Sequence, residues 1–145
     1  LIPELYSNSS KQEFIVTASS ELNQSYQGWN VFNSRNIEWA TSEVRMSAYL
    51  DIELPFPVAI WGFALGGRLS NTERWFKWAI EGSNDKKIWK NLYVALEDYI
   101  GNKTKFYTLK RVSEKYLYYR FEGVIGEPTN PGLSYMQLYS VDDLL

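Results

Sequence analysis

Short stretches in which apolar and polar residues alternate, separated by turn-forming residues, constrain the fold of this chain most. Residues 49–54 read Tyr-Leu-Asp-Ile-Glu-Leu, a period of two that buries one face of a β-strand, whereas an amphipathic helix needs a period near 3.6. Only residues 27–32 and 94–99 have the pattern of a helical turn. We therefore predict an all-β fold, a sandwich or jelly roll of about eight antiparallel strands. The predicted strands are residues 14–18, 49–54 (stopped by Pro55), 57–65, 76–81, 88–94, 105–109, 116–124 and 134–141.

The length of 145 residues and the apolar share of 45 % suit one domain with its own core. The chain contains no internal repeat, no linker and no apolar run long enough for a transmembrane helix. We predict a single domain over residues 1–145, with a core at about 14–141. Because the sequence begins at Leu1 and not at Met, we expect this domain to belong to a larger protein.

Charge and missing residue types exclude several functions. The net charge of −2 argues against nucleic acid or an anionic membrane as the main partner, since phosphate binding needs surplus cations. The chain has neither Cys nor His, which excludes disulfides, thiol or histidine catalysis and most zinc sites. The aromatic share of 17 %, with six Trp and eleven Tyr, is high for a small domain and favours a binding surface. The alternative is a Trp-rich core, and we expect most of the six Trp to lie there.

Residues 82–89, Gly-Ser-Asn-Asp-Lys-Lys-Ile-Trp, resemble a turn found in discoidin, or coagulation factor V/VIII C-type, domains. Family 32 carbohydrate-binding modules share that fold. The resemblance implies a jelly-roll β-sandwich, galactose-binding-domain-like, with a binding face formed by loops at one end. Trp39 and Trp89 are expected to pack in the core, because large aromatic residues in strands are mostly buried. Further segments resemble motifs of the same family and occur in the same order along the chain: residues 16–20, 29–33 with Trp39, 49–54, 118–121 and 133–139.

Two branches of the family bear on the function. The amino-acid sequence of residues 66–68 and 78–85 is similar to that of modules on phage tail fibres and other virion appendages. The membrane-binding branch of the family carries a disulfide and basic residues, and this chain, without Cys and slightly acidic, does not fit that branch. We therefore expect no membrane insertion.

Many family members hold a structural Ca²⁺ near the binding loops. Where the family has Asp, Gly and Glu, this chain has Asn33, Ser34 and Tyr135. Hard cations prefer several charged oxygen ligands. We therefore expect the calcium site to be lost, with Glu38 as the one candidate replacement ligand, and we predict no cofactor.

The loop at residues 66–75 carries the predicted binding residues. Arg68 matches an Arg that contacts galactose-like sugars in the relatives, and Asn71 lies near the position of a contacting Asn. Arg74 and Trp75 belong to the same loop, and strand alternation predicts that Trp75 faces outward while Trp78 faces the core. The alternative for Arg68 is that it pairs with a carboxylate and stiffens the loop.

Other loops expected at the same end are residues 23–28, with Tyr26, and 41–47, with Arg45, and residues 127–132 are a further candidate for the rim. The histidine that usually contacts galactose in the relatives is absent. A sugar other than galactose, or a protein partner, would account for its absence.

We predict a non-catalytic glycan-binding module that attaches a larger extracellular or virion-borne protein to a cell-surface glycan. The alternative is a structural or docking module of a phage tail or adhesin assembly, in contact with other subunits. The expected location is extracellular or on a virion surface. An enzyme built on Glu38, Glu43 and Glu73 has no support in their spacing, because glycoside hydrolysis needs two carboxyl groups at a fixed separation.

Overall fold

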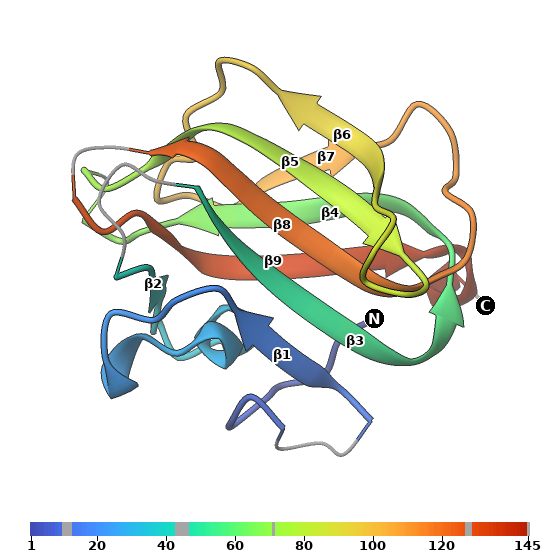
Figure 1. The fold of residues 1–145 in the computed structure, drawn as a ribbon, viewed down its shortest axis with the longest axis horizontal. Coiled ribbons are helices and arrows are strands. Elements are labelled where there is room, and N and C mark those ends of the chain that lie inside the picture. Colours follow the sequence, from blue (N-terminus) through green and yellow to red (C-terminus); the bar gives the residue numbers. More distant parts are fainter. Residues whose placement is uncertain (10–12, 43–46, 71, 127–128, 145) are drawn as a thin grey trace.

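The computed structural model describes residues 1–9, 13–42, 47–70, 72–126 and 129–144. Two antiparallel sheets face each other and form a sandwich (Figure 1), which confirms the predicted fold class. One sheet has the order β1 (Ile15–Ala18), β3 (Ala48–Val58), β8 (Tyr116–Gly126), β5 (Trp75–Ser83), β6 (Lys90–Ala95). The other has the order β2 (Trp39–Ala40), β9 (Gly132–Ser140), β4 (Ile60–Gly67), β7 (Lys105–Thr108). Short 3-10 turns are η1 (Gln24–Tyr26), η2 (Gly28–Phe32) and η3 (Val141–Leu144).

The predicted element boundaries are partly wrong. The helical turn within residues 27–32 exists as η2, but residues 94–99 form no helix, since β6 runs to Ala95. Pro55 does not end β3, although the pairing of β3 with β8 skips from Glu53 to Val58. Proline has no N–H to donate to the neighbouring strand, so the ladder is interrupted there while the backbone stays extended. Within the described residues, no helix is long and apolar enough to cross a membrane.

Aromatic side chains fill the space between the sheets. Trp78 stacks on Phe121 with ring centroids 5.9 Å apart, and Trp39 stacks on Trp75 at 6.4 Å. Burying a ring of this size removes about 150–250 Å² from water, worth roughly 4–6 kcal/mol at 25 cal/mol per Å². The largest fully buried side chains are Trp39, Trp75, Trp78, Tyr119, Phe63 and Phe121.

The prediction that Trp75 faces outward is wrong, because Trp75 and Trp78 are both 0 % exposed. The pairing of β5 with β8 shifts register on either side of Lys77. The first shift inserts an extra residue, Phe76, into β5 and reverses the alternation there, so residues three apart share a face. Trp75 lies so close to Gly123 that a Cβ on that glycine would come within 2.4 Å of its ring.

The N-terminal segment packs against the strands at one flank of the sandwich. Gln137 of β9 accepts a hydrogen bond from the Ile2 N–H (2.9 Å) and donates one to the Ile2 carbonyl (3.0 Å). Leu5 is fully buried, and its carbonyl accepts a hydrogen bond from the Asn33 amide at 2.9 Å. At the opposite flank the edge strands are β6 and β7, at the top of Figure 1.

Candidate functional site

Loops at one end of the sandwich converge on Arg68, the first residue after β4. Its Nη1 donates hydrogen bonds to Glu73 Oε2 (3.0 Å) and to the Asn130 carbonyl (2.9 Å), and its Nη2 donates to Glu38 Oε1 (3.3 Å). The Arg68 side chain is 8 % exposed. The structure thus shows the alternative stated for Arg68, pairing with a carboxylate, and it pairs with two, while its contact with a sugar stays a prediction.

Further hydrogen bonds fix the same loops around this ion-pair network. Glu38 Oε2 accepts from the Leu69 N–H, and Glu73 Oε2 accepts from the Thr129 hydroxyl at 2.9 Å. The Asn130 amide donates to the Thr41 carbonyl at 2.9 Å. Loops held in this way would lose little conformational entropy if a ligand bound to them.

Tyr26 is the aromatic residue that the structure brings to Arg68, with the guanidinium carbon 5.1 Å from the ring centroid. Tyr26 lies in η1, whose first turn is capped by Asn23, because the Asn23 Oδ1 accepts a hydrogen bond from the Ser25 N–H at 2.8 Å. The Tyr26 side chain is half-buried. Two of the predicted binding residues, Tyr26 and Arg68, thus lie together.

The remaining predicted binding residues are placed differently. The Arg74 guanidinium lies over the ring of Tyr99, 4.2 Å from its centroid, and Trp75 is in the core. Tyr99 is not among the predicted binding residues; the one feature that marks it in the sequence is an aromatic residue in the segment after β6. Asn71 and Arg45 lie outside the described residues, so their role stays a prediction.

Two of the three carboxylates that an enzyme would use, Glu38 and Glu73, form ion pairs with Arg68. Glu38 and Glu73 pair with the same guanidinium, which neutralises the groups that hydrolysis would need as acid and base. Glu43 lies outside the described residues.

The residues at the family's calcium position do not fit the ion. The Asn33 amide donates to the Leu5 carbonyl, and its Oδ1 accepts from the Arg35 N–H at 3.1 Å. The Asn30 amide donates to the carbonyls of Ser25 (2.9 Å) and Glu38 (2.6 Å). The Asn33 Oδ1 and the Glu38 carbonyl oxygen thus already accept protein N–H groups, and the described residues contain no group of three or more His, Cys, Asp or Glu side chains placed to hold a metal.

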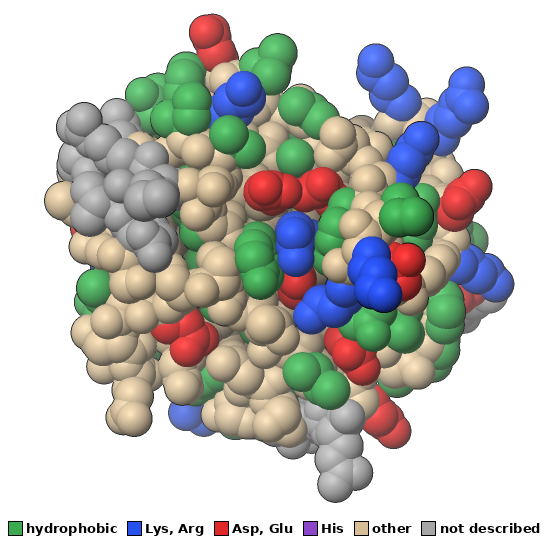
Figure 2. Space-filling model, viewed as in Figure 1, with side chains coloured by type: hydrophobic (Ala, Val, Ile, Leu, Met, Phe, Trp, Pro, Cys, Tyr) green, Lys and Arg blue, Asp and Glu red, His purple; other side chains and the backbone are tan. Residues whose placement is uncertain are grey.

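The prediction that Trp89 packs in the core is wrong. Trp89 is half-buried on the outer face of the five-stranded sheet, where the Arg120 guanidinium carbon lies 4.0 Å from its ring centroid and 3.8 Å from that of Tyr49. Arg120 also pairs with Asp51 through two hydrogen bonds, of 2.7 and 2.9 Å. Figure 2 shows acidic and basic side chains side by side in the middle of this face.

A tight turn after β5 places Trp89 there. The Asp85 Oδ1 accepts from the N–H groups of Lys87 (2.8 Å) and Ile88 (3.0 Å), and Lys86 adopts a left-handed conformation with φ 60°. Backbone hydrogen bonds, first from Ile88 and then from Lys87, lower the pKa of Asp85. The turn reverses the chain before β6 and leaves the Trp89 ring against Arg120.

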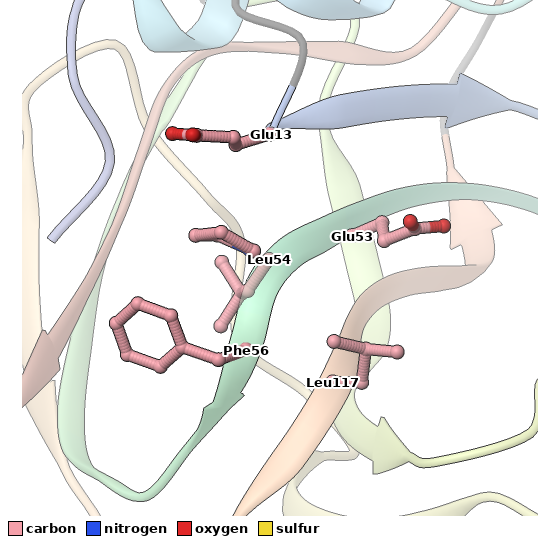
Figure 3. A pocket seen from close by; sticks show the side chains of 6 residues that line it. Glu13, Glu53, Leu54, Phe56 and Leu117 are labelled. Carbon is pink, nitrogen blue, oxygen red and sulfur yellow. The ribbon is translucent and has the colours of Figure 1, made fainter.

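A hollow of about 560 Å³ lies at the other end of β3, away from Arg68 (Figure 3). Its lining includes Glu13, Glu53, Leu54, Phe56 and Leu117. The carboxylates of Glu13 and Glu53 point in opposite directions, so they do not converge on a ligand. The loop end around Arg68 is therefore the better candidate site.

No protein-family model matches the sequence, and no curated protein sequence matches it. The structure, however, matches solved sugar-binding modules. Chitosan-binding module 1 of a Paenibacillus sp. IK-5 chitosanase/glucanase has a TM-score of 0.74 and 19 % identity, covering 93 % of this chain and 100 % of that module. The family 32 module of Clostridium perfringens NanJ, solved with galactose, has a TM-score of 0.76 and 15 % identity, covering 94 % and 96 %. The fold is that of the family 32 carbohydrate-binding modules.

Chitosan-binding module 2 of the same Paenibacillus enzyme, solved with chitotriose, has a TM-score of 0.77 and 14 % identity, covering 88 % of this chain and 97 % of that module. The expected discoidin-like, galactose-binding-domain-like fold is thereby confirmed. Both chitosan-binding modules derive from a chitosanase/glucanase, and other matches cover about a quarter of fucosidase chains.

Proposed function

We propose that this chain is a non-catalytic glycan-binding module that binds a sugar at the loop end around Arg68 and Tyr26. The observation that carries the proposal is the convergence of separate loops on this pair, in a sandwich with the fold of sugar-binding modules. Arg68 holds the loops through Glu38 and Glu73, and the half-buried ring of Tyr26 offers a flat apolar surface.

The chemistry of the loop end suits a pyranose. An aromatic ring covers the C–H face of such a sugar, while hydroxyl and amide groups bond its hydroxyls, each hydrogen bond worth about 1 kcal/mol net. Thr72 and Thr129 are exposed there and Asn130 is half-buried. Because Arg68 faces two carboxylates, the charge of the cluster favours a neutral sugar or an amino sugar over an acidic one.

The sugar class follows from this chemistry and from what related modules bind. Galactose and chitotriose are the ligands of two matching modules, and the two represent a neutral and an amino sugar. The absent histidine distinguishes this chain from the galactose mode of its relatives. A single shallow site of this kind binds weakly, so several copies on one assembly would supply the strength of attachment.

The proposal includes the parent protein that carries this module. The module would attach an extracellular or virion-borne parent protein to a cell-surface glycan. The alternative, a docking module that contacts other subunits of an assembly, stays a prediction.

The test is a glycan array that includes galactosides and chitooligosaccharides, probed with the domain in multivalent form. Tyr26→Ala should remove binding, while Tyr26→Phe should retain it because the ring is kept. Phe56→Ala is the matched control, since Phe56 is an exposed aromatic residue at the opposite end of the sandwich. A blank array from folded wild-type protein, or full binding by Tyr26→Ala, would contradict the proposal.

A further inference from the structure

A groove of about 1030 Å³ opens on the flank of the sandwich between β6 and the segment that follows β7. One wall is residues 90–94 of β6, and the other is residues 108–114. The groove runs along β6 from Lys90 to Val94 and past the end of β7, whereas Arg68 lies where β4 ends, next to the start of β5. Since β4 runs antiparallel to β7, and β5 to β6, the groove and the loop end are at opposite ends of the strands.

The floor of the groove is apolar and firmly supported. Leu92, Tyr93 and Leu109 are half-buried and pack against the core. The Tyr93 ring lies 5.3 Å from Phe63 and 5.5 Å from Trp78, centroid to centroid. A floor of this kind can cover the C–H faces of sugar rings without rearrangement.

The second wall is anchored to β4. The Ile60 N–H donates to the Ser113 hydroxyl, and the Ser113 N–H donates to the Ile60 carbonyl, both at 2.9 Å. The Leu109 N–H donates to the Trp61 carbonyl at 2.9 Å. The groove is therefore preformed.

The rim of the groove is basic although the chain as a whole is acidic. Lys90 lies on one wall and Lys110 and Arg111 on the other, all exposed, and Glu114 is the acidic residue among the lining residues. Figure 2 shows Lys and Arg side chains projecting together at the upper right, over the segment after β7. Cations on both walls of a preformed groove concentrate anions there.

We propose that this groove binds an acidic glycan, a polysaccharide that carries carboxylate or sulfate groups. The sugar rings lie on the apolar floor, and the anionic groups pair with the cations of both walls. The site is separate from the loop end and does not depend on the sugar that binds there.

The form of β6 argues against an extended acidic peptide as the occupant. Tyr93 lies opposite Ile80 and Asn91 opposite Glu81, which leaves Leu92 as an extra residue, a bulge in the edge strand. A bulge twists an edge strand away from a flat pairing surface, and lysine on an edge discourages the addition of another strand. Lys90 supplies that charge on β6.

The experiment measures binding of the whole domain to immobilised heparin and polygalacturonate, with a neutral galactan and poly-L-glutamate for comparison. The double variant Lys110→Glu/Arg111→Glu should bind the acidic glycans about tenfold or more weakly, because two groove cations become anions. The control Arg35→Glu/Lys103→Glu makes the same change in net charge at exposed residues outside the groove and should retain most of the binding.

Three outcomes would overturn the proposal. They are wild-type protein that binds neither acidic glycan, an equal loss in the control variant, and poly-L-glutamate binding as tight as heparin binding, which would indicate an acidic peptide or charge alone. Tyr26→Ala separates the two sites, since it should leave heparin binding unchanged even where it removes binding at the loop end.

Discussion

Raising the pH from about 5 to 9 should destabilise this domain through one buried carboxyl group, Glu81 of β5. Glu81 is 8 % exposed on the outer side of the five-stranded sheet and lies opposite Arg120 in register. Arg120, however, directs its two-point ion pair to Asp51. Burial, then a hydrogen bond with Glu122 and the charge of Glu122, raises the pKa of Glu81 from 4.5 to about 8.

The sign of the effect follows from proton binding. Between the unfolded pKa of 4.5 and the folded pKa of about 8, the folded protein holds a proton that the unfolded chain has released. The free energy of unfolding therefore falls as the pH rises through this interval, by up to about 1.4 kcal/mol per pH unit. The full interval sets a ceiling of roughly 4–5 kcal/mol, and local relaxation with entry of water should leave about 2–3 kcal/mol.

The variant Glu81→Gln tests this reasoning. Its amide can donate a hydrogen bond to Glu122 as the protonated carboxyl does, but it does not titrate, so its stability should vary little between pH 5 and 9. Glu97→Gln removes an exposed carboxylate instead and should keep the wild-type dependence. Denaturant unfolding followed by tryptophan fluorescence at each pH measures the difference. A wild-type curve parallel to that of Glu81→Gln would refute the buried, shared proton.

Three further predictions concern Arg68, the tryptophans and calcium. Arg68→Ala should cost about 3–5 kcal/mol of stability, measured by denaturant unfolding, because it leaves Glu38 and Glu73 without their cation. Adding Glu38→Gln and Glu73→Gln should restore part of that loss, and an Arg68→Ala variant as stable as the wild type would contradict the network. Trp78→Ala should lower the free energy of unfolding by about 3–5 kcal/mol, and Trp89→Ala by about half of that or less, since of the two only Trp78 is fully buried. Equal losses of stability in calorimetry would indicate that Trp89 packs in the core. A chelator, or added Ca²⁺, should leave the Tm unchanged, because Asn33 stands where the family has Asp and its side chain already bonds the backbone of Leu5 and Arg35. A shift of several degrees would show a bound ion.

The sandwich could be predicted because alternation is a local property of each strand. The residue pairs that define the sheets, such as Tyr49 with Glu122, were not predicted, because the sequence alone does not show which strands are neighbours. The two-residue strand β2 is too short to show a period. The bulge in β5 could not be predicted either, because an extra residue is defined only relative to the partner strand. For this reason the predicted face of Trp75 is wrong.

The candidate site was only half predictable for a related reason. The family resemblance selected Arg68 and the loop positions selected Tyr26, and the structure brings these two together. Glu38 and Asn130, in contrast, are 30 and 62 residues from Arg68 in the sequence, and nothing local marks them as its partners. Trp89 shows the same limit, since its turn was recognised but the position of Arg120 beneath its ring was not.

The charges around the two proposed sites argue that they serve different ligands. At the loop end one guanidinium, that of Arg68, faces two carboxylates, so an acidic sugar would meet repulsion there. Among the lining residues of the groove the three cations Lys90, Lys110 and Arg111 outnumber the one acidic residue, Glu114, so an acidic sugar would meet attraction. Since the sites lie at opposite ends of the strands, two neighbouring glycans of different charge can bind at the same time without overlapping. Binding through two weak sites gains strength from the high effective concentration of the second contact, which gives a single domain part of the avidity that an assembly would otherwise supply.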